Sequence, residues 1–147
     1  MSNGRSLDDV LKTHARWMEE ESSGFRCILD RETLNEAQLQ GVALQRAIIK
    51  GSTFLDAEMS GADLARASID GADFQRAMLS GADLGGAQIS ETLFSFCWLS
   101  GAIFSDAKLR IVSLRRASAR DARFQGVCIE SCNFTEAILS SASFHHA

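Results

Sequence analysis

The sequence predicts an all-β solenoid with four sides per coil, preceded by a single α-helix. Two observations predict the solenoid: a large apolar residue recurs every five positions, and the type of that residue tends to repeat every twenty. A third observation, an amphipathic stretch ahead of the repeats, predicts the helix. With 147 residues, the chain has the length of one domain.

The five-residue period is clearest in residues 57–84. There a small residue stands two places before each large apolar residue. We call these two positions of each repeat the small slot and the large slot. A large apolar residue fills the large slot from Leu29 or Leu34 to Phe144, except at Ala119. Five residues turn a helix by roughly 140° and reverse the face of a strand, so neither element alone keeps these residues on one side. A bend must therefore follow each short extended segment, and four such sides close one coil.

A second period of twenty supports four sides per coil, because residues twenty apart would stack on one another. One column of the large slot is mostly aromatic: Leu34, Phe54, Phe74, Phe94, Leu114, Phe134. The bends also form columns, the longest being Gly41, Gly61, Gly81, Gly101. Glycine at the third position of a bend fits a type II turn, which needs a positive φ there.

These residues resemble the pentapeptide-repeat family, whose motif is A(D/N)LXX. The motif occurs here as Ala62-Asp63-Leu64, Ala72-Asp73-Phe74 and Ala82-Asp83-Leu84. The resemblance implies a right-handed quadrilateral β-helix with the small and the large apolar slot both pointing inward. About six coils would stack at ~4.8 Å into a rod of roughly 29 Å. The resemblance implies no activity, because members of the family are functionally diverse.

Residues 1–24 are predicted to form a tail, a capping helix and a connection, and residues 25–147 the solenoid. Ser6 and Asp9 have the form of a capping box. The residues that follow at helical spacing are Leu7, Val10, Leu11, His14, Trp17 and Met18. This helix should cover the first coil, which would otherwise expose its core and its unpaired backbone. We expect His14 to pack inside this cap, because no other ligands are spaced around it for a metal.

Bulk composition indicates a cytoplasmic protein. A net charge of −4 argues against direct nucleic-acid binding, which needs a cationic face. No stretch has the form of a signal peptide or a membrane span. Cys27, Cys97 and Cys132 occupy the small inward slot far apart along the stack, so we expect core residues rather than disulfides.

A cluster of apolar residues breaks the polar pattern of the outward slots. Leu93, Phe96 and Trp98 fall where side chains should face solvent, and Trp98 follows Met78 in its column. Exposed aromatic patches mark binding sites. The competing interpretation is structural: Phe96 stands between Arg76 and Arg116 in its own column, where cation–π stacking would hold it. The sequence leaves both interpretations open for a partner site made of Met78, Leu93, Phe96, Trp98 and Arg116.

The outward charges change sign along the chain. The segment nearer the C-terminus, residues 106–123, is basic. It contains two acidic residues, Asp106 and Asp121, and six basic ones: Lys108, Arg110, Arg115, Arg116, Arg120 and Arg123. Below it, acidic residues outnumber basic ones. This pattern could steer a charged partner, or it could be a solvated face whose charges pair between coils.

Two features near the C-terminal end also matter. Ala119 replaces the Leu or Met of its column, which predicts a local cavity unless Val112 or other neighbours fill it. After Phe144 only three residues follow, so we expect the last coil to be uncovered. We therefore predict a homodimer through this end, with contacts from Ile138, Leu139 and Phe144.

We expect a non-enzymatic protein, because the sequence offers no nucleophile, base and orienting group converging on a pocket. No cofactor and no metal site are expected, and a His145–His146 pair at the terminus is a weak metal signal. The favoured function is a protein-interaction scaffold that displays the patch around Trp98 and Phe96 to an unidentified protein partner. The alternative, from the family resemblance, is a DNA mimic that binds and protects topoisomerases such as gyrase. The basic upper segment departs from that alternative.

Overall fold

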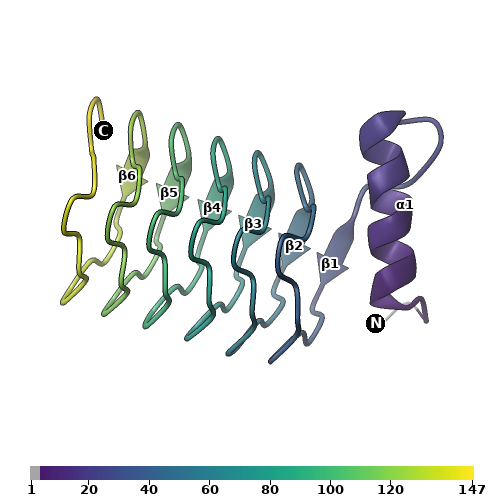
Figure 1. The fold of residues 1–147 in the computed structure, drawn as a ribbon, viewed down its shortest axis with the longest axis horizontal. Coiled ribbons are helices and arrows are strands. Elements are labelled where there is room, and N and C mark those ends of the chain that lie inside the picture. The colour runs from purple at the N-terminus through teal and green to yellow at the C-terminus, as the bar shows by residue number, and fades with distance from the viewer. Residues whose placement is uncertain (1–3) are drawn as a thin grey trace.

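The computed structural model describes residues 4–147 as one helix followed by a β-solenoid (Figure 1). Helix α1 spans Leu7–Glu19. Six strands follow, one in each coil: β1 (Ile28–Asp30), β2 (Ile48–Lys50), β3 (Ser68–Asp70), β4 (Gln88–Ser90), β5 (Lys108–Arg110) and β6 (Cys128–Glu130). They form one parallel sheet in chain order, with each residue paired to the residue twenty positions later, as Ile49 is to Ile69. The predicted fold class is confirmed.

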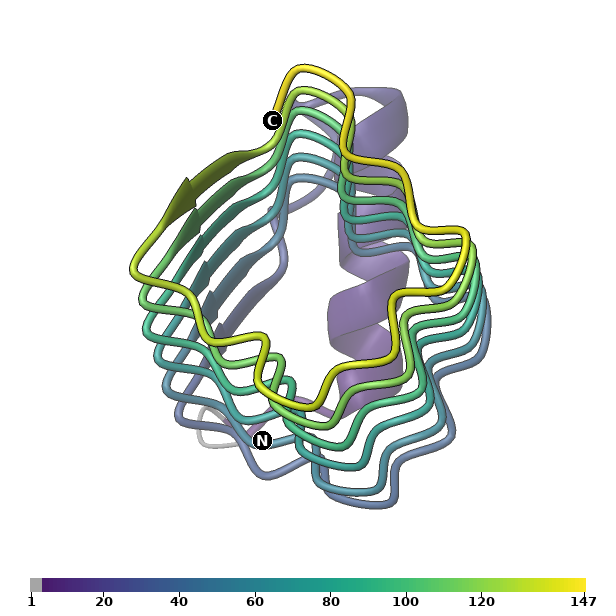
Figure 2. The same ribbon diagram turned by 90° about the vertical axis from the view of Figure 1, so that its left-hand side faces the viewer.

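The solenoid is right-handed. Seen from its C-terminal end, the chain runs anticlockwise as it advances toward the viewer (Figure 2). About five complete turns separate β1 from β6, and the chain then continues along three further sides. We number the coils 1 to 6 from residue 27 in steps of twenty, so that coil 4 is residues 87–106 and coil 5 is residues 107–126.

Backbone hydrogen bonds join each coil to the next in both directions. The N–H of inward Leu64 donates to the carbonyl of Asp83 at 2.7 Å, and the N–H of Asp83 donates back to Ala62 at 2.9 Å. A turn bond from the N–H of Ala67 to the carbonyl of Leu64, at 3.0 Å, closes the bend between them. The third bend position has a positive φ whether it holds Gly81 (67°) or another residue such as Arg66 (57°). The corner geometry is therefore set by the coil, and glycine is only the least strained occupant.

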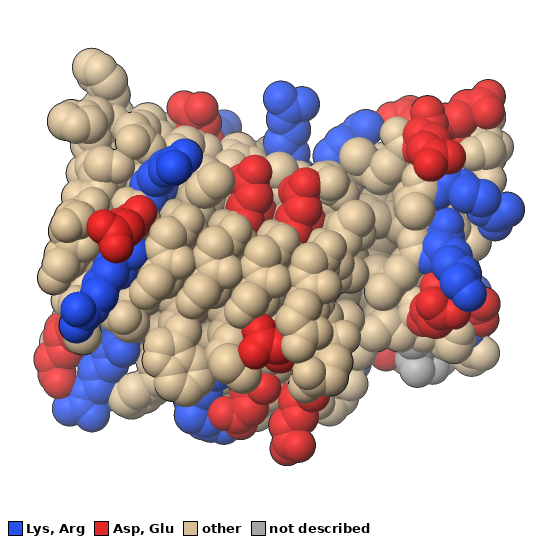
Figure 3. Space-filling view, viewed as in Figure 1, with Lys and Arg blue, Asp and Glu red and all other residues tan. Residues whose placement is uncertain are grey.

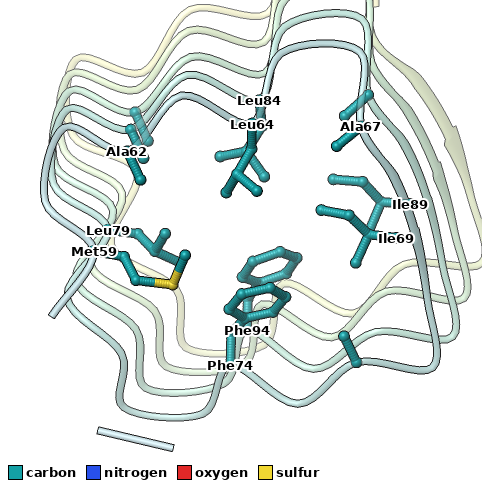
Figure 4. Packing of buried hydrophobic residues seen from close by; sticks show 14 of the residues in the cluster. Met59, Ala62, Leu64, Ala67, Ile69, Phe74, Leu79, Leu84, Ile89 and Phe94 are labelled. Atoms are coloured by element: carbon teal, nitrogen blue, oxygen red, sulfur yellow. The ribbon is translucent and has the colours of Figure 1, made fainter. Parts of the chain in front are cut away.

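The two inward slots fill the interior (Figure 4). Phe54, Phe74 and Phe94 are fully buried and stack in parallel, with ring centroids 4.5 and 5.0 Å apart. Ala119 is fully buried as well. All four cysteines are free. Burial raises the pKa of the Cys27 and Cys97 thiols, to about 11 and about 12, so these two cysteines are unreactive core residues.

Helix α1 lies across the N-terminal end of the solenoid, next to β1 (Figures 1 and 2). Ser6 is its N-cap and accepts a hydrogen bond from the Asp9 N–H at 3.1 Å. His14 is completely buried, stacks on Trp17 at 5.6 Å, and its Nδ1 accepts from the Cys27 N–H at 3.0 Å. The prediction that His14 packs inside the cap is confirmed, and its bond to Cys27 ties the helix to the first coil.

Candidate functional site

The aromatic cluster lies on the side of the rod, as expected from its slots. Trp98 pairs with Met78 of the coil below and with Ser118 of the coil above. Trp98 is 52% exposed, Phe96 41% and Leu93 38%, and Met78 between them is half-buried. We call Met78, Leu93, Phe96 and Trp98 the side patch. It spans two adjacent sides of coils 3 and 4 and the corner at Phe96.

Phe96 is partly explained as a structural residue. The Arg116 guanidinium lies over its ring, 5.7 Å from the centroid, and Arg116 Nε donates to Glu136 at 2.6 Å. This hydrogen bond lowers the pKa of the Glu136 carboxyl. Arg76 does not complete the expected sandwich, because it forms a bidentate pair with Asp56 at 2.8 and 2.7 Å.

Trp98 has no comparable structural explanation. It takes part in none of the ring or cation–π contacts found within residues 4–147. About half of its surface, 52%, is exposed to solvent. Among the side patch residues, Trp98 is therefore the strongest candidate for a residue that binds a partner.

Ile111 is a further exposed apolar residue, at the corner that precedes the side carrying Leu93, and the sequence did not single it out. It stands two residues before Ser113, which pairs with Leu93 of the coil below. Its side chain is 49% exposed although its backbone is left-handed, with φ of 56°. Gly51 and Gly71 occupy the same corner column. A β-branched residue there is strained by about 1–2 kcal/mol, and this mismatch within the column was the signal that could have identified it.

Charges of the basic coil are only partly neutralised. Arg110 pairs with Glu91 at 3.4 Å, and Arg115 approaches Glu136 at 3.8 Å. Within residues 4–147, three basic side chains of coil 5 form no ion pair: Lys108, Arg120 and Arg123. On the face shown in Figure 3, acidic side chains lie over the middle of the rod, and basic ones lie toward both of its ends. Charges therefore pair between coils in part, as one interpretation predicted, and the steering of a charged partner stays a prediction.

The aspartates of the repeat motif are structural. Asp63, Asp73 and Asp83 each accept a hydrogen bond from the backbone N–H two residues later, at 3.0, 3.0 and 2.8 Å. Such bonds fix the bend locally. One oxygen of each carboxylate is therefore held by the backbone of its own coil.

Chemical sites are not evident in the described part of the chain. No group of three or more His, Cys, Asp or Glu side chains is placed to hold a metal ion within residues 4–147. An open hollow of about 670 Å³ lies along the sheet, with Lys50, Asp70, Lys108 and Arg110 in its lining. Its charges alternate in sign along the rod and converge on no single point.

A second exposed apolar area lies beside the cap. Phe25 is 70% exposed and Ile28 50%, next to Arg26 in the lining of a shallow hollow. Sequence reasoning did not single them out, because Phe25 precedes the regular repeats and the first coil is irregular. Ile28 was identifiable as a large residue in an outward slot.

The C-terminal end exposes part of the core. Phe144 is 37% exposed, Leu139 is half-buried, and Ile138 on the adjoining side is 41% exposed. In coils 1 to 5 the N–H groups of the large inward residues donate to the next coil, as that of Ala119 does to Ile138. Those of coil 6 find no such acceptor within the described residues.

These features define the class of protein: a rigid repeat solenoid that presents side-chain patches rather than an enclosed site. A family profile for pentapeptide repeats matches eight copies within residues 57–95, 87–126, 97–135 and 120–147. The matched segments together cover more than half of the chain. The protein therefore belongs to the pentapeptide-repeat family, which confirms the resemblance found in the sequence.

Several solved structures are similar to this chain. HetL, a pentapeptide repeat protein involved in heterocyst differentiation regulation in the cyanobacterium Nostoc sp. strain PCC 7120, is 20% identical, with a TM-score of 0.37. The match covers 82% of this chain but 60% of HetL. Rfr23 from the cyanobacterium Cyanothece 51142 is 19% identical over 91% of this chain and 95% of its own, with a TM-score of 0.32. Full-length QnrB1, a plasmid-mediated fluoroquinolone resistance protein, is 21% identical over 81% of this chain and 70% of its own, with a TM-score of 0.32.

No curated protein sequence matches the chain significantly. Among residues 4–147, no helix has the length and apolar character needed to cross a bilayer. The comparisons therefore establish the family and leave the function to be argued from the surface.

Proposed function

We propose that this protein is a non-enzymatic interaction scaffold of the cytoplasm, and that its side patch binds a protein partner. The observation that carries this proposal is Trp98, a half-exposed indole without a ring or cation contact in the described chain. Aromatic residues of this kind anchor protein interfaces because they bury a large area at little entropic cost. Leu93, Phe96 and Met78 supply the apolar surroundings.

The rigidity of the coil supports this role. Trp98 is held by hydrogen bonds from its N–H to Ala77 at 3.1 Å and from the Leu79 N–H to its carbonyl at 2.7 Å. A patch fixed on such a backbone does not need to be ordered when a partner binds, so less free energy is lost on association.

The test is site-specific photo-cross-linking in the native cell. A photoreactive amino acid replaces Trp98, and, as a matched control, Gln88, which is exposed in the same slot of the same coil on the sheet side. We expect one dominant protein adduct at Trp98 and none at Gln88. Substitution of Leu93 and Phe96 by serine should remove that adduct while the melting temperature stays within a few degrees. Equal adducts from both positions would refute a partner site at the side patch.

A DNA-mimic role in topoisomerase protection is the alternative, and the surface gives it less support. Such a mimic needs continuous negative charge along one side, whereas coil 5 carries unpaired basic side chains at Lys108, Arg120 and Arg123. A gyrase subunit as the cross-linked adduct at Trp98 would favour this alternative.

We also propose self-association through coil 6. Its half-exposed Leu139 and Phe144, together with Ile138, would be covered by a second copy about a two-fold axis. Light scattering at high micromolar concentration should give the mass of a dimer, and Leu139→Arg should give the mass of a monomer. A monomeric mass for the unmodified chain at that concentration would refute this proposal.

A further inference from the structure

Two arginines border Trp98 on the C-terminal side of the side patch. Ser118 pairs with Trp98 across the coil boundary, and Arg116 and Arg120 stand two residues before and after Ser118. Arg116 is occupied by Glu136 and by the ring of Phe96. Arg120 is exposed and forms no ion pair or side-chain hydrogen bond within residues 4–147. Its guanidinium therefore remains available beside the indole.

The coil that carries Arg120 is strongly imbalanced in charge. Coil 5 contains six basic side chains and one acidic side chain, Asp121. Glu91 and Glu136, from the neighbouring coils, pair with Arg110, Arg115 and Arg116. Of the three basic side chains that remain unpaired among the described residues of this coil, Arg120 lies on the side of the rod that carries Trp98, where it would attract and orient a partner's carboxylate.

The opposite border of the side patch is acidic. Glu58, in coil 2, pairs with Met78 in coil 3. The Glu58 carboxylate accepts hydrogen bonds from the N–H and hydroxyl of Ser60, at 3.1 and 2.5 Å. The side patch therefore lies between an acidic border at Glu58 and a basic border at Arg120. A bound segment with the reverse arrangement of charges would complement both borders.

We propose that the partner segment bound by the side patch is acidic next to its apolar anchor, with a carboxylate placed on Arg120. This inference rests on the proposed function, because it specifies the chemistry of the partner at the same site. The acidic end of the segment points toward coil 6 and away from Glu58. Arginine suits this contact because its planar guanidinium can hold a carboxylate by two hydrogen bonds.

The experiment is selection of a random-peptide library displayed on phage against the immobilised full chain. Two variants make the selection informative. Arg120→Glu reverses the charge beside Trp98, and Lys108→Glu makes the same change of net charge in the same coil on the sheet side. Lys108 is exposed and is without an ion pair among the described residues, so it is a matched control.

We expect the selected peptides to combine a large apolar residue with at least two Asp or Glu residues close to it. Their affinity, measured with synthetic peptides, should fall by about tenfold or more for Arg120→Glu and by less than about twofold for Lys108→Glu. Trp98 emission reports binding in a Trp17→Phe background, because the chain has two tryptophans.

The remaining outcomes separate this inference from the proposed function. Neutral or basic peptides that are lost on Trp98→Arg but kept on Arg120→Glu would support the side patch and overturn the acidic partner. No selection above the level of Trp98→Arg would count against both. If Arg120→Glu and Lys108→Glu reduced the peptide affinity equally, a local contact with Arg120 would be refuted. The overall positive charge of coil 5 would then explain the binding. Tighter binding of a short oligothymidine than of any selected peptide would overturn the assignment to a protein segment.

Discussion

Filling the interior at Ala119 tests how the core of this solenoid is packed. Ala119 is fully buried in a column that holds Leu99 below it and Leu139 above it. In the large slots, coil 5 has Leu114 and Ala119 at the positions where coil 4 has Phe94 and Leu99. Coil 5 thus has about six fewer side-chain carbons there, which leaves its core under-filled unless the surroundings have collapsed.

Ala119→Leu restores the side chain of the column and adds three carbons to a buried position. At about 0.8 kcal/mol per buried carbon, the unfolding free energy should rise by up to about 2 kcal/mol. For a chain of this size, the melting temperature should then rise by roughly 4–8 °C. Thermal unfolding followed by circular dichroism measures this shift, and urea unfolding gives the free energy directly.

Two control variants test whether the effect is specific to the space around Ala119. Leu99→Ala makes the reverse change one coil below and should cost about 2–5 kcal/mol. Ala117→Leu adds the same carbons to a buried small slot of coil 5, where overpacking should cost about 1–3 kcal/mol. A melting temperature that falls for Ala119→Leu as it does for Ala117→Leu would refute the reasoning, because it would show that neighbouring side chains already fill this space.

Three further predictions concern the cap and the strained corner. Burial lowers the pKa of His14, offset in part by the Gln45 carbonyl, and nearby arginines lower it further. The cap should therefore be fully stable above pH 6.5 and lose stability as the pH falls below that value; a melting temperature that falls no more between pH 7 and pH 5 than that of His14→Gln would contradict this. Gly24→Ala would place a Cβ against the Thr13 carbonyl and 2.6 Å from Trp17 N, so far-ultraviolet circular dichroism should show an earlier loss of helix on heating, and an unchanged transition would mean that the connection can shift. Ile111→Asn should raise the unfolding free energy by about 1 kcal/mol, because asparagine tolerates the left-handed backbone better; a decrease in urea unfolding would show that the isoleucine side chain compensates by packing.

Much of the site followed from the period of twenty. Because the coil repeats with this period, residues of one column must be neighbours, and Met78 beside Trp98 could be predicted without a structure. The same rule makes the pairs of Asp56 with Arg76 and of Arg116 with Glu136 foreseeable, since each joins residues twenty apart. The structural interpretation of Phe96 placed Arg76 on its ring instead, because column position alone does not say which neighbour a long side chain contacts.

The sequence by itself determined the backbone path of this protein. An inward slot every five residues and matching side chains every twenty leave only a four-sided solenoid able to bury them, and the segment from Ser6 onward had the composition of a capping helix. The same periodicity placed Leu93, Phe96 and Trp98 at the surface.

Only the tertiary structure decided which exposed groups remain unused. Arg110 stands next to Glu130 in its column, yet its guanidinium pairs with Glu91 at 3.4 Å, and Arg115 approaches Glu136 of a different column at 3.8 Å. Rotamers of flexible side chains settle such choices, and they depend on contacts between coils whose energies differ by a fraction of a kcal/mol (~0.2–1 kcal/mol). Burial of the periodic core, worth several kcal/mol per coil (about 1.5–3 kcal/mol for each large side chain), permits no such freedom. The path of the chain was therefore readable from the sequence, whereas the chemistry of its surface was not.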